Sequence, residues 1–182
     1  MLDDVYNAKI LEYAGNIPRT GRLENPDATA KAHSKLCGST VMVDLKTEMK
    51  GNDLVVTDFA HDVKACALGQ ASSSIMARNV IGATAAELKA LKKTMYAMLK
   101  EGGPAPDGKF EEFRFLEPVR EYKARHASTL LTFDAVVDCL EQIEAKLAAA
   151  PVDDAAKKEK QAKVKKAALN ALTAAGIKHR VL

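Results

Sequence analysis

Apolar and polar residues alternate along two consecutive segments in the first half of the chain. In residues 40–49, Val41, Val43 and Leu45 share one face, while the other face is polar, with Asp44 among its residues and Met42 as the exception. A period of two is typical of half-buried strands. A Gly-Asn-Asp turn follows, residues 54–65 predict a second strand, and residues 28–36 predict a third.

Helical spacing dominates the remaining part of the first 147 residues. Apolar side chains recur every three to four residues in residues 3–14, 68–81, 84–100 and 128–147. Thr84 and Glu87 have the spacing of a capping box, and residues 105–115 are expected to form a polar, irregular connection. The pattern predicts an α+β fold with three strands and several helices.

The last part of the chain differs in composition from the rest. Residues 145–182 contain 9 Lys and Arg against 3 Asp and Glu, whereas the whole chain has a net charge of only +3. We therefore predict two domains, a globular domain over residues 1–147 and an Ala/Lys-rich basic helical tail over residues 148–182. The tail is interpreted as a solubilising segment, and docking onto an acidic partner is the alternative.

Charge and hydropathy narrow the class of protein. The body of the chain is mildly acidic, so nothing in it is typical of a nucleic-acid surface. No apolar run approaches the roughly 20 residues that span a bilayer. The acidic first residues are not typical of a secretory signal, so we expect a cytoplasmic protein.

The three cysteines are the main candidates for chemistry. They are too few and too irregularly spaced for a disulfide framework or a CxxC zinc site. Cys37 lies in a turn before a predicted strand, and Cys66 lies where a strand gives way to a helix, whose N-terminus favours a thiolate. A hairpin would bring these two together. Cys139, within the last helix, is expected to be a buried small apolar residue, and His126 is placed to serve as a third ligand.

Three short motifs surround these residues and resemble a known family. The first comprises residues 16–23, 27–30 and Cys37-Gly38, the second is Cys66 followed by residues 70–76, and the third spans residues 125–135. Over residues 1–144 the chain resembles the U-type iron–sulfur cluster assembly scaffolds, which include IscU, SufU and the N-terminal domain of NifU. The long connection before the third motif is similar to that of the SufU branch.

The resemblance implies a fold, a function and a set of ligands. The family fold is a small antiparallel sheet packed by helices, so we expect the three predicted strands to form such a sheet. Family members take sulfur from a cysteine desulfurase and hold a nascent cluster, or zinc, on three Cys and one Asp. In this chain Ser39 occupies the position of the Asp, and Ser128 that of the third Cys. The residues predicted to bind the cluster are Cys37, Cys66, His126 and Ser128, and those predicted to bind metal are Cys37, Cys66 and His126. The implied cargo is a transient iron–sulfur cluster, with zinc as the alternative.

These observations favour an assembly protein over an enzyme. The leading hypothesis is a scaffold that accepts sulfur and iron, holds a nascent cluster and serves apo-protein acceptors. The alternative is a sulfur-accepting or zinc-binding partner that activates a cysteine desulfurase without holding a stable cluster. A nucleophilic pair of Cys37 and His33 is disfavoured because no oxyanion motif accompanies it, and a purely structural interaction protein is left open. Neither nucleic acid nor a membrane is expected as a partner, and a homodimer is left open.

Overall fold

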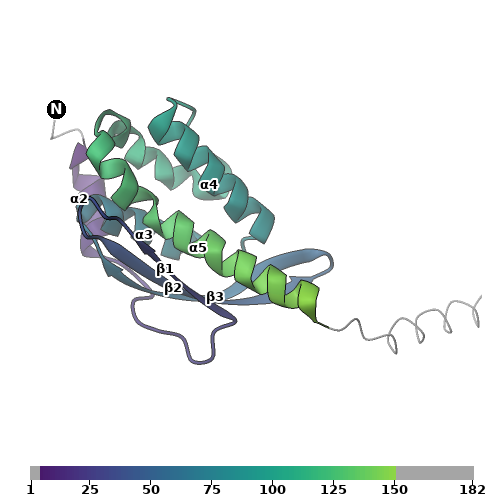
Figure 1. Ribbon diagram of the computed structural model, residues 1–182. Coiled ribbons are helices and arrows are strands. Elements are labelled where there is room, and N and C mark those ends of the chain that lie inside the picture. The colour runs from purple at the N-terminus through teal and green to yellow at the C-terminus, as the bar shows by residue number, and fades with distance from the viewer. Residues whose placement is uncertain (1–4, 151–182) are drawn as a thin grey trace, which may run out of the picture. The chain divides into compact units, whose positions relative to one another are not determined.

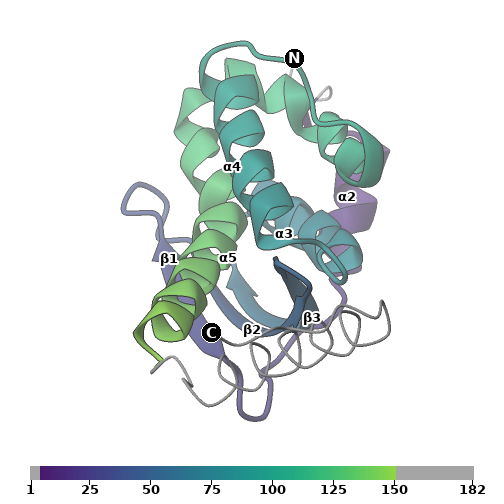
Figure 2. The same cartoon turned by 90° about the vertical axis from the view of Figure 1, so that its right-hand side faces the viewer.

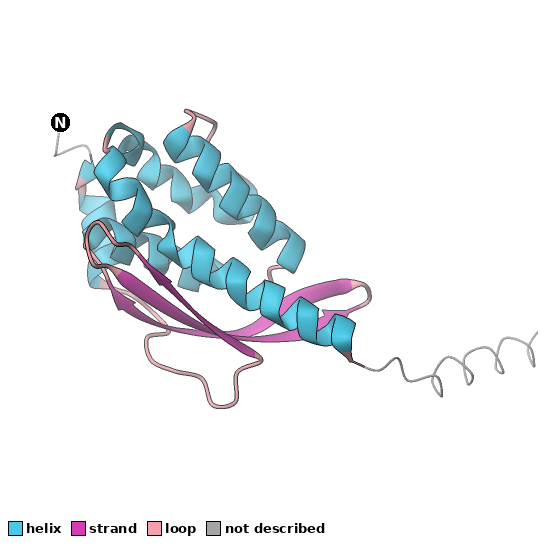
Figure 3. Cartoon of the chain, viewed as in Figure 1, coloured by secondary structure: helices cyan, strands magenta, loops and turns pink. Residues whose placement is uncertain are grey.

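A long β-hairpin supplies the central strand and one edge strand of a three-stranded antiparallel sheet (Figure 1). In it, β2 (Thr40–Lys50) pairs with β3 (Asp53–Lys64) on one side and with β1 (Ala28–His33) on the other. The computed structural model describes residues 5–150, and Figure 3 distinguishes its helices and strands by colour. The predicted α+β fold with three antiparallel strands is confirmed.

The helices gather on one side of this sheet, as Figures 1 and 2 show. They are α2 (Ala8–Gly15), α3 (Ala67–Asn79), α4 (Ala85–Lys100), the 3-10 helix η1 (Gly108–Glu121) and α5 (Lys123–Ala149). Helix α5 contacts the first two strands. Gln142 donates a hydrogen bond to the carbonyl of Thr29 in β1 at 3.1 Å, and Cys139 Sγ lies 3.4 Å from the carbonyl oxygen of Val43 in β2. None of the helices within residues 5–150 has the length and apolar character needed to cross a membrane.

The apolar stripe predicted for β2 faces the core. Val41, Val43 and Leu45 are each 0% exposed. A shift of one residue in the pairing would turn all three toward solvent, so their burial specifies the register of the sheet. The predicted capping box is also confirmed, since Thr84 Oγ1 accepts from the amide of Glu87, and Glu87 Oε2 accepts from the amide of Thr84.

The connection predicted to be irregular is instead a 3-10 helix, and that prediction is wrong. η1 buries Phe110, Phe113, Leu116 and Val119. These apolar residues are three apart, and a 3-10 helix has 3.0 residues per turn, so they form one continuous stripe. A search for the α-helical period of 3.6 residues does not detect this spacing.

Helix α5 also begins earlier than predicted. It starts at Lys123 instead of residue 128, so His126 and Ser128 both lie in its first two turns. Residues 151–182 lie outside the described part of the chain. The basic helical tail over residues 148–182 and the domain boundary at residue 147 therefore stay predictions.

Asp44 was expected on the polar face of its strand, and the structure corrects this. Its side chain is fully buried. The carboxylate accepts hydrogen bonds from the guanidinium of Arg22 at 2.6 and 3.0 Å, from the hydroxyl of Thr29 at 2.6 Å and from the amide of Leu23 at 3.0 Å. Burial alone would raise the pKa of Asp44, but the hydrogen bonds from Arg22 and Thr29 hold it below its usual range. Asp44 thereby ties the segment before β1 to the middle of the sheet.

Replacing this carboxylate by an amide is expected to destabilise the protein in a pH-dependent way. Asp44→Asn loses charge-assisted hydrogen bonds and should cost about 2 kcal/mol of unfolding free energy at neutral pH. Because the folded pKa of Asp44 is lowered, the wild-type advantage is complete above the ordinary pKa of about 3.9 and disappears as pH falls through the lowered value. Denaturant unfolding across acid pH measures this. Asp53→Asn, at an exposed turn position, is the control, and an equal loss in both variants would contradict the assignment.

Candidate functional site

The register of the hairpin places Cys37 and Cys66 at the same end of the sheet. Thr40, the first residue of β2, pairs with Lys64, the last residue of β3. Cys37 lies three residues before Thr40, and Cys66 lies two residues after Lys64. The two cysteines therefore lie just beyond neighbouring strand ends, as the predicted hairpin requires.

Cys37 is presented by a closed turn between β1 and β2. The amide of Ser34 donates to the carbonyl of Ser39 at 2.9 Å, and the amide of Gly38 donates to the carbonyl of Ser34 at 2.9 Å. Gly38 has a φ of +70°, which favours glycine because a side chain would be strained there. These bonds fix the backbone, and the thiol side chain at its tip is exposed.

Two serine hydroxyls flank the sulfur of Cys37. Its Sγ lies 3.4 Å from Ser34 Oγ and 3.0 Å from Ser39 Oγ. Hydroxyl groups that donate to a thiolate stabilise the charged form. The hydrogen bonds from Ser34 and then Ser39 lower the pKa of Cys37, and the positive charge of Arg125 lowers it further. A lowered pKa and an exposed position are the properties of a reactive thiol.

Cys66 has a different environment at the N-cap position of α3. Its Sγ lies 3.3 Å from Ser128 Oγ, on the second turn of α5. The same Ser128 hydroxyl donates its one proton to the carbonyl of Arg125 at 3.0 Å. In this arrangement the Ser128 oxygen accepts from the thiol of Cys66. Cys66 therefore donates to a single hydroxyl, whereas the sulfur of Cys37 has two hydroxyls within reach that can donate to it once it is a thiolate.

Small residues on α3 allow α5 to approach closely enough for this contact. A Cβ atom added at Gly69 would lie 2.7 Å from Cβ of Ala65 and 2.9 Å from the carbonyl oxygen of Ser128. One turn further along α3, Ser72 Oγ donates to the carbonyl of Thr129 at 2.8 Å. The small, hydroxylated residues after Cys66 therefore serve the close packing of α3 against α5.

His126 is turned into the body of the protein. It is 7% exposed, and its Nε2 lies 3.1 Å from the carbonyl oxygen of Val119 and 3.0 Å from that of Arg120. Since a carbonyl only accepts, Nε2 carries the proton and a neutral ring keeps its lone pair on Nδ1. Metal binding by this ring in the observed conformation would therefore use Nδ1, and its role as a ligand stays a prediction.

The remaining cysteine and one histidine are buried and have partners elsewhere, whereas His33 lies at the end of the sheet that carries the two thiols. Cys139 is fully buried with Sγ 3.4 Å from the carbonyl of Val43, and burial raises its pKa to about 12. Its expected role as a buried apolar residue is confirmed. His61 is also buried, its Nε2 lies 2.9 Å from the carbonyl of Pro18, and burial lowers its pKa. His33 is an exposed residue at the end of β1.

The site around the two thiols has few side chains that can bind a metal ion. Within residues 5–150, no three or more His, Cys, Asp or Glu side chains are grouped to hold a metal ion. The side chains hydrogen-bonded to the two thiols are instead three serines, Ser34, Ser39 and Ser128. Ser34 and the electrostatic role of Arg125 are not predicted from the sequence. The signal for Ser34 is its position three residues before a cysteine in a turn.

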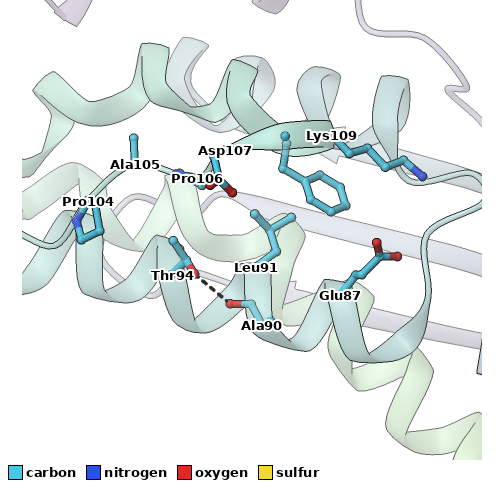
Figure 4. A pocket seen from close by; sticks show the side chains of 11 residues that line it. Glu87, Ala90, Leu91, Thr94, Pro104, Ala105, Pro106, Asp107 and Lys109 are labelled. Carbon is cyan, nitrogen blue, oxygen red and sulfur yellow. Dashed lines mark hydrogen bonds between the residues drawn. The ribbon is translucent and has the colours of Figure 1, made fainter.

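A separate groove lies between α4 and the segment leading into η1 (Figure 4). Leu91 and Phe110 form part of its apolar wall, and Glu87 and Lys109 lie at its edge. The residues that line it include no cysteine or histidine. It is therefore distinct from the thiol site.

The helix crossing beside Cys66 can be tested with a single methyl group. Gly69→Ala places a Cβ within 3 Å of Ala65 and Ser128, so α3 and α5 must separate at a cost of about 1–3 kcal/mol. We expect a lower unfolding free energy and faster alkylation of Cys66, because Ser128 moves away from its sulfur. Gly15→Ala is the control, since a Cβ there meets nothing within 4 Å among the described residues. Unchanged stability in Gly69→Ala would contradict the close crossing.

Comparison with known proteins identifies the relatives of this chain. Residues 5–113 match the model of the NifU-like N terminal domain. The chain is 26% identical over 139 residues to the iron-sulfur cluster assembly scaffold protein IscU of Thermotoga maritima, covering 76% of this chain and 94% of that protein.

Two solved structures have the same fold. The N-terminal part of a nitrogen-fixing NifU-like protein from Brucella abortus is 68% identical, with a TM-score of 0.76, over 80% of this chain and 98% of that chain. A protein assigned as a SUF-system scaffold from Fervidobacterium islandicum is 22% identical, with a TM-score of 0.67, over 76% and 98% of the two chains. The chain therefore belongs to the NifU-like N-terminal domain family, as its motifs predict.

Proposed function

We propose that this protein is an iron–sulfur cluster assembly scaffold that receives sulfur at Cys37 and holds a nascent cluster between Cys37 and Cys66. The observation that carries the proposal is the exposed thiol of Cys37 with two serine hydroxyls on its sulfur, at the sheet end it shares with Cys66. Membership of the NifU-like family and the match to an IscU scaffold along 94% of its length support it.

The sulfur donor is a cysteine persulfide on a cysteine desulfurase. The Cys37 thiolate attacks the outer sulfur of that persulfide, a new S–S bond forms on Cys37, and the thiolate of the donor cysteine leaves. The electron pair of the broken S–S bond leaves with the donor thiolate, and the new S–S bond uses an electron pair of the Cys37 thiolate. The transferred sulfur keeps its oxidation level, so the exchange needs no external oxidant or reductant. Because the thiolate is the nucleophile, the lowered pKa of Cys37 favours this step at neutral pH.

The cluster is the cargo of the site, and the ligand set favours loose retention. Cys37 and Cys66 supply two thiolates, the form that binds iron and zinc. We propose that His126, through Nδ1, and the Ser128 oxygen complete the set. A neutral imidazole and a hydroxyl bind less strongly than the thiolate and carboxylate they replace. The cluster would then pass readily to apo-protein acceptors.

The second candidate function is activation of a cysteine desulfurase by sulfur acceptance, without a stable cluster. The specific observation in its favour is the presence of Ser39 and Ser128 at two positions where the resembled family has metal ligands. Zinc is the alternative metal for the same two thiolates. In both cases we propose an assembly protein of the cytoplasm and not an enzyme with its own substrate.

Reconstitution distinguishes the two candidates. Anaerobic incubation of the protein with iron, cysteine and a cysteine desulfurase should produce a thiolate-dependent visible absorption band. Cys37→Ser and Cys66→Ser should each lose it, because one of only two thiolates is removed. Cys139→Ser should retain it, since this thiol is buried away from the site. Full colour in the Cys37→Ser, Cys66→Ser double variant would overturn the scaffold proposal, and colourless but persulfidated wild type would favour the second candidate.

The serine hydroxyls are expected to control the reactivity of Cys37. Ser34→Ala and Ser39→Ala each remove a hydroxyl that lies beside Cys37 Sγ and can donate to its thiolate, so the pKa of Cys37 rises and less thiolate is present at neutral pH. Alkylation of Cys37 by iodoacetamide should slow several-fold at neutral pH and recover in alkali, as peptide mass spectrometry over a pH series measures. Thr57→Ala, an exposed position on β3, is the control. An unshifted pH profile in both serine variants would refute this role.

A further inference from the structure

The turn that carries Cys37 also exposes a large apolar side chain. Leu36 is 81% exposed, compared with 52% for Leu11 and Met49, two other exposed large hydrophobic residues. It directly precedes Cys37 in the chain. An exposed leucine on its own needs no explanation, but this one lies beside the reactive thiol of the protein.

The exposure of Leu36 is built into the backbone of the turn. The hydrogen bonds between Ser34, Gly38 and Ser39 close the turn beneath it. Ser34 and Ser39 are themselves 4% exposed, so the base of the turn is anchored in the body of the protein. Leu36 is therefore held outward by a defined conformation, with no folding partner inside the described part of the chain to cover it.

Positive charge surrounds this position. Lys35 precedes Leu36, and Arg125 is close enough to lower the pKa of Cys37. Lys64 ends β3 at the same end of the sheet, where its Nζ lies 3.8 Å from a carboxylate oxygen of Asp62. All three side chains are exposed. Residues 28–40, which form β1 and the turn, contain no acidic residue. A partner that covers the turn would meet an apolar tip with cations around it.

Sulfur transfer requires that the turn be covered. For Cys37 to attack a protein-bound persulfide, the two sulfur atoms must approach to near contact, about 3–3.5 Å. The surface that carries the donor persulfide must then also contact Leu36, the neighbouring residue. We propose that Leu36 is the apolar anchor of a docking contact with the sulfur donor, a protein whose persulfide lies beside an apolar pocket rimmed by carboxylates. This inference rests on the proposed function of Cys37 as sulfur acceptor.

Leu36→Ser tests the contact in the full chain. With a cysteine desulfurase and cysteine, the concentration of this protein that gives half-maximal persulfidation of Cys37 should rise about tenfold, the size of effect typical of a buried apolar anchor. Met49→Ser is the matched control, because Met49 is an exposed apolar residue at the opposite end of the same hairpin. Lys35→Glu should weaken the reaction most at low ionic strength.

A second donor separates docking from chemistry. Inorganic polysulfide needs no docking surface, so it should persulfidate Cys37 equally well in wild type, Leu36→Ser and Met49→Ser. Unchanged desulfurase kinetics in Leu36→Ser would overturn the docking proposal and leave sulfur acceptance intact. If Leu36→Ser slowed persulfidation by polysulfide as much as persulfidation by the desulfurase, the docking proposal would also be overturned, because Leu36 would then act on the thiol itself. A wild-type dimer that dissociates in Leu36→Ser, with unchanged kinetics, would assign the turn to a second copy of the chain. Failure of both donors on wild-type Cys37 would overturn the proposed function as well.

Discussion

The antiparallel pairing of β2 with β3 is the constraint on which the site depends. Because Thr40 lies opposite Lys64, the turn before β2 and the helix after β3 begin at the same end of the sheet. Val41, Val43 and Leu45 hold that register, since a slip of one residue would expose all three. The positions of Cys37 and Cys66 thus follow from apolar residues that take no part in their chemistry.

The two thiols nevertheless have different environments, and each difference has a local cause. A short turn places Ser34 and Ser39 on the sulfur of Cys37, where their hydroxyls favour the thiolate. The close crossing of α3 and α5 at Gly69 brings Ser128 to Cys66. Serines therefore occupy the space around both sulfurs. The result is a site with one thiol suited to accept sulfur and a second suited to join it in holding cargo.

The sequence predicts most of the sheet and the two thiols, because strand alternation and turn residues are local signals. It does not predict Asp44, whose burial depends on an arginine 22 residues earlier in the chain. It predicts no structure for η1, because a spacing of three residues fits neither the strand nor the α-helix period. Ser128 was found only by resemblance, and its contact with Cys66 depends on how closely two helices pack. The pattern of apolar and polar residues does not reveal interactions between residues that are distant in the sequence.

The most direct test of the central claim is to follow which thiol receives sulfur first. The protein would be mixed anaerobically with a cysteine desulfurase and cysteine, quenched at short times with an alkylating reagent, and mapped by peptide mass spectrometry. The account predicts that one added sulfur atom appears first on the peptide containing Cys37, before any appears on Cys66 and with none on Cys139. Sulfur that appears first on Cys66, while Cys37 remains an intact and reactive thiol, would contradict it.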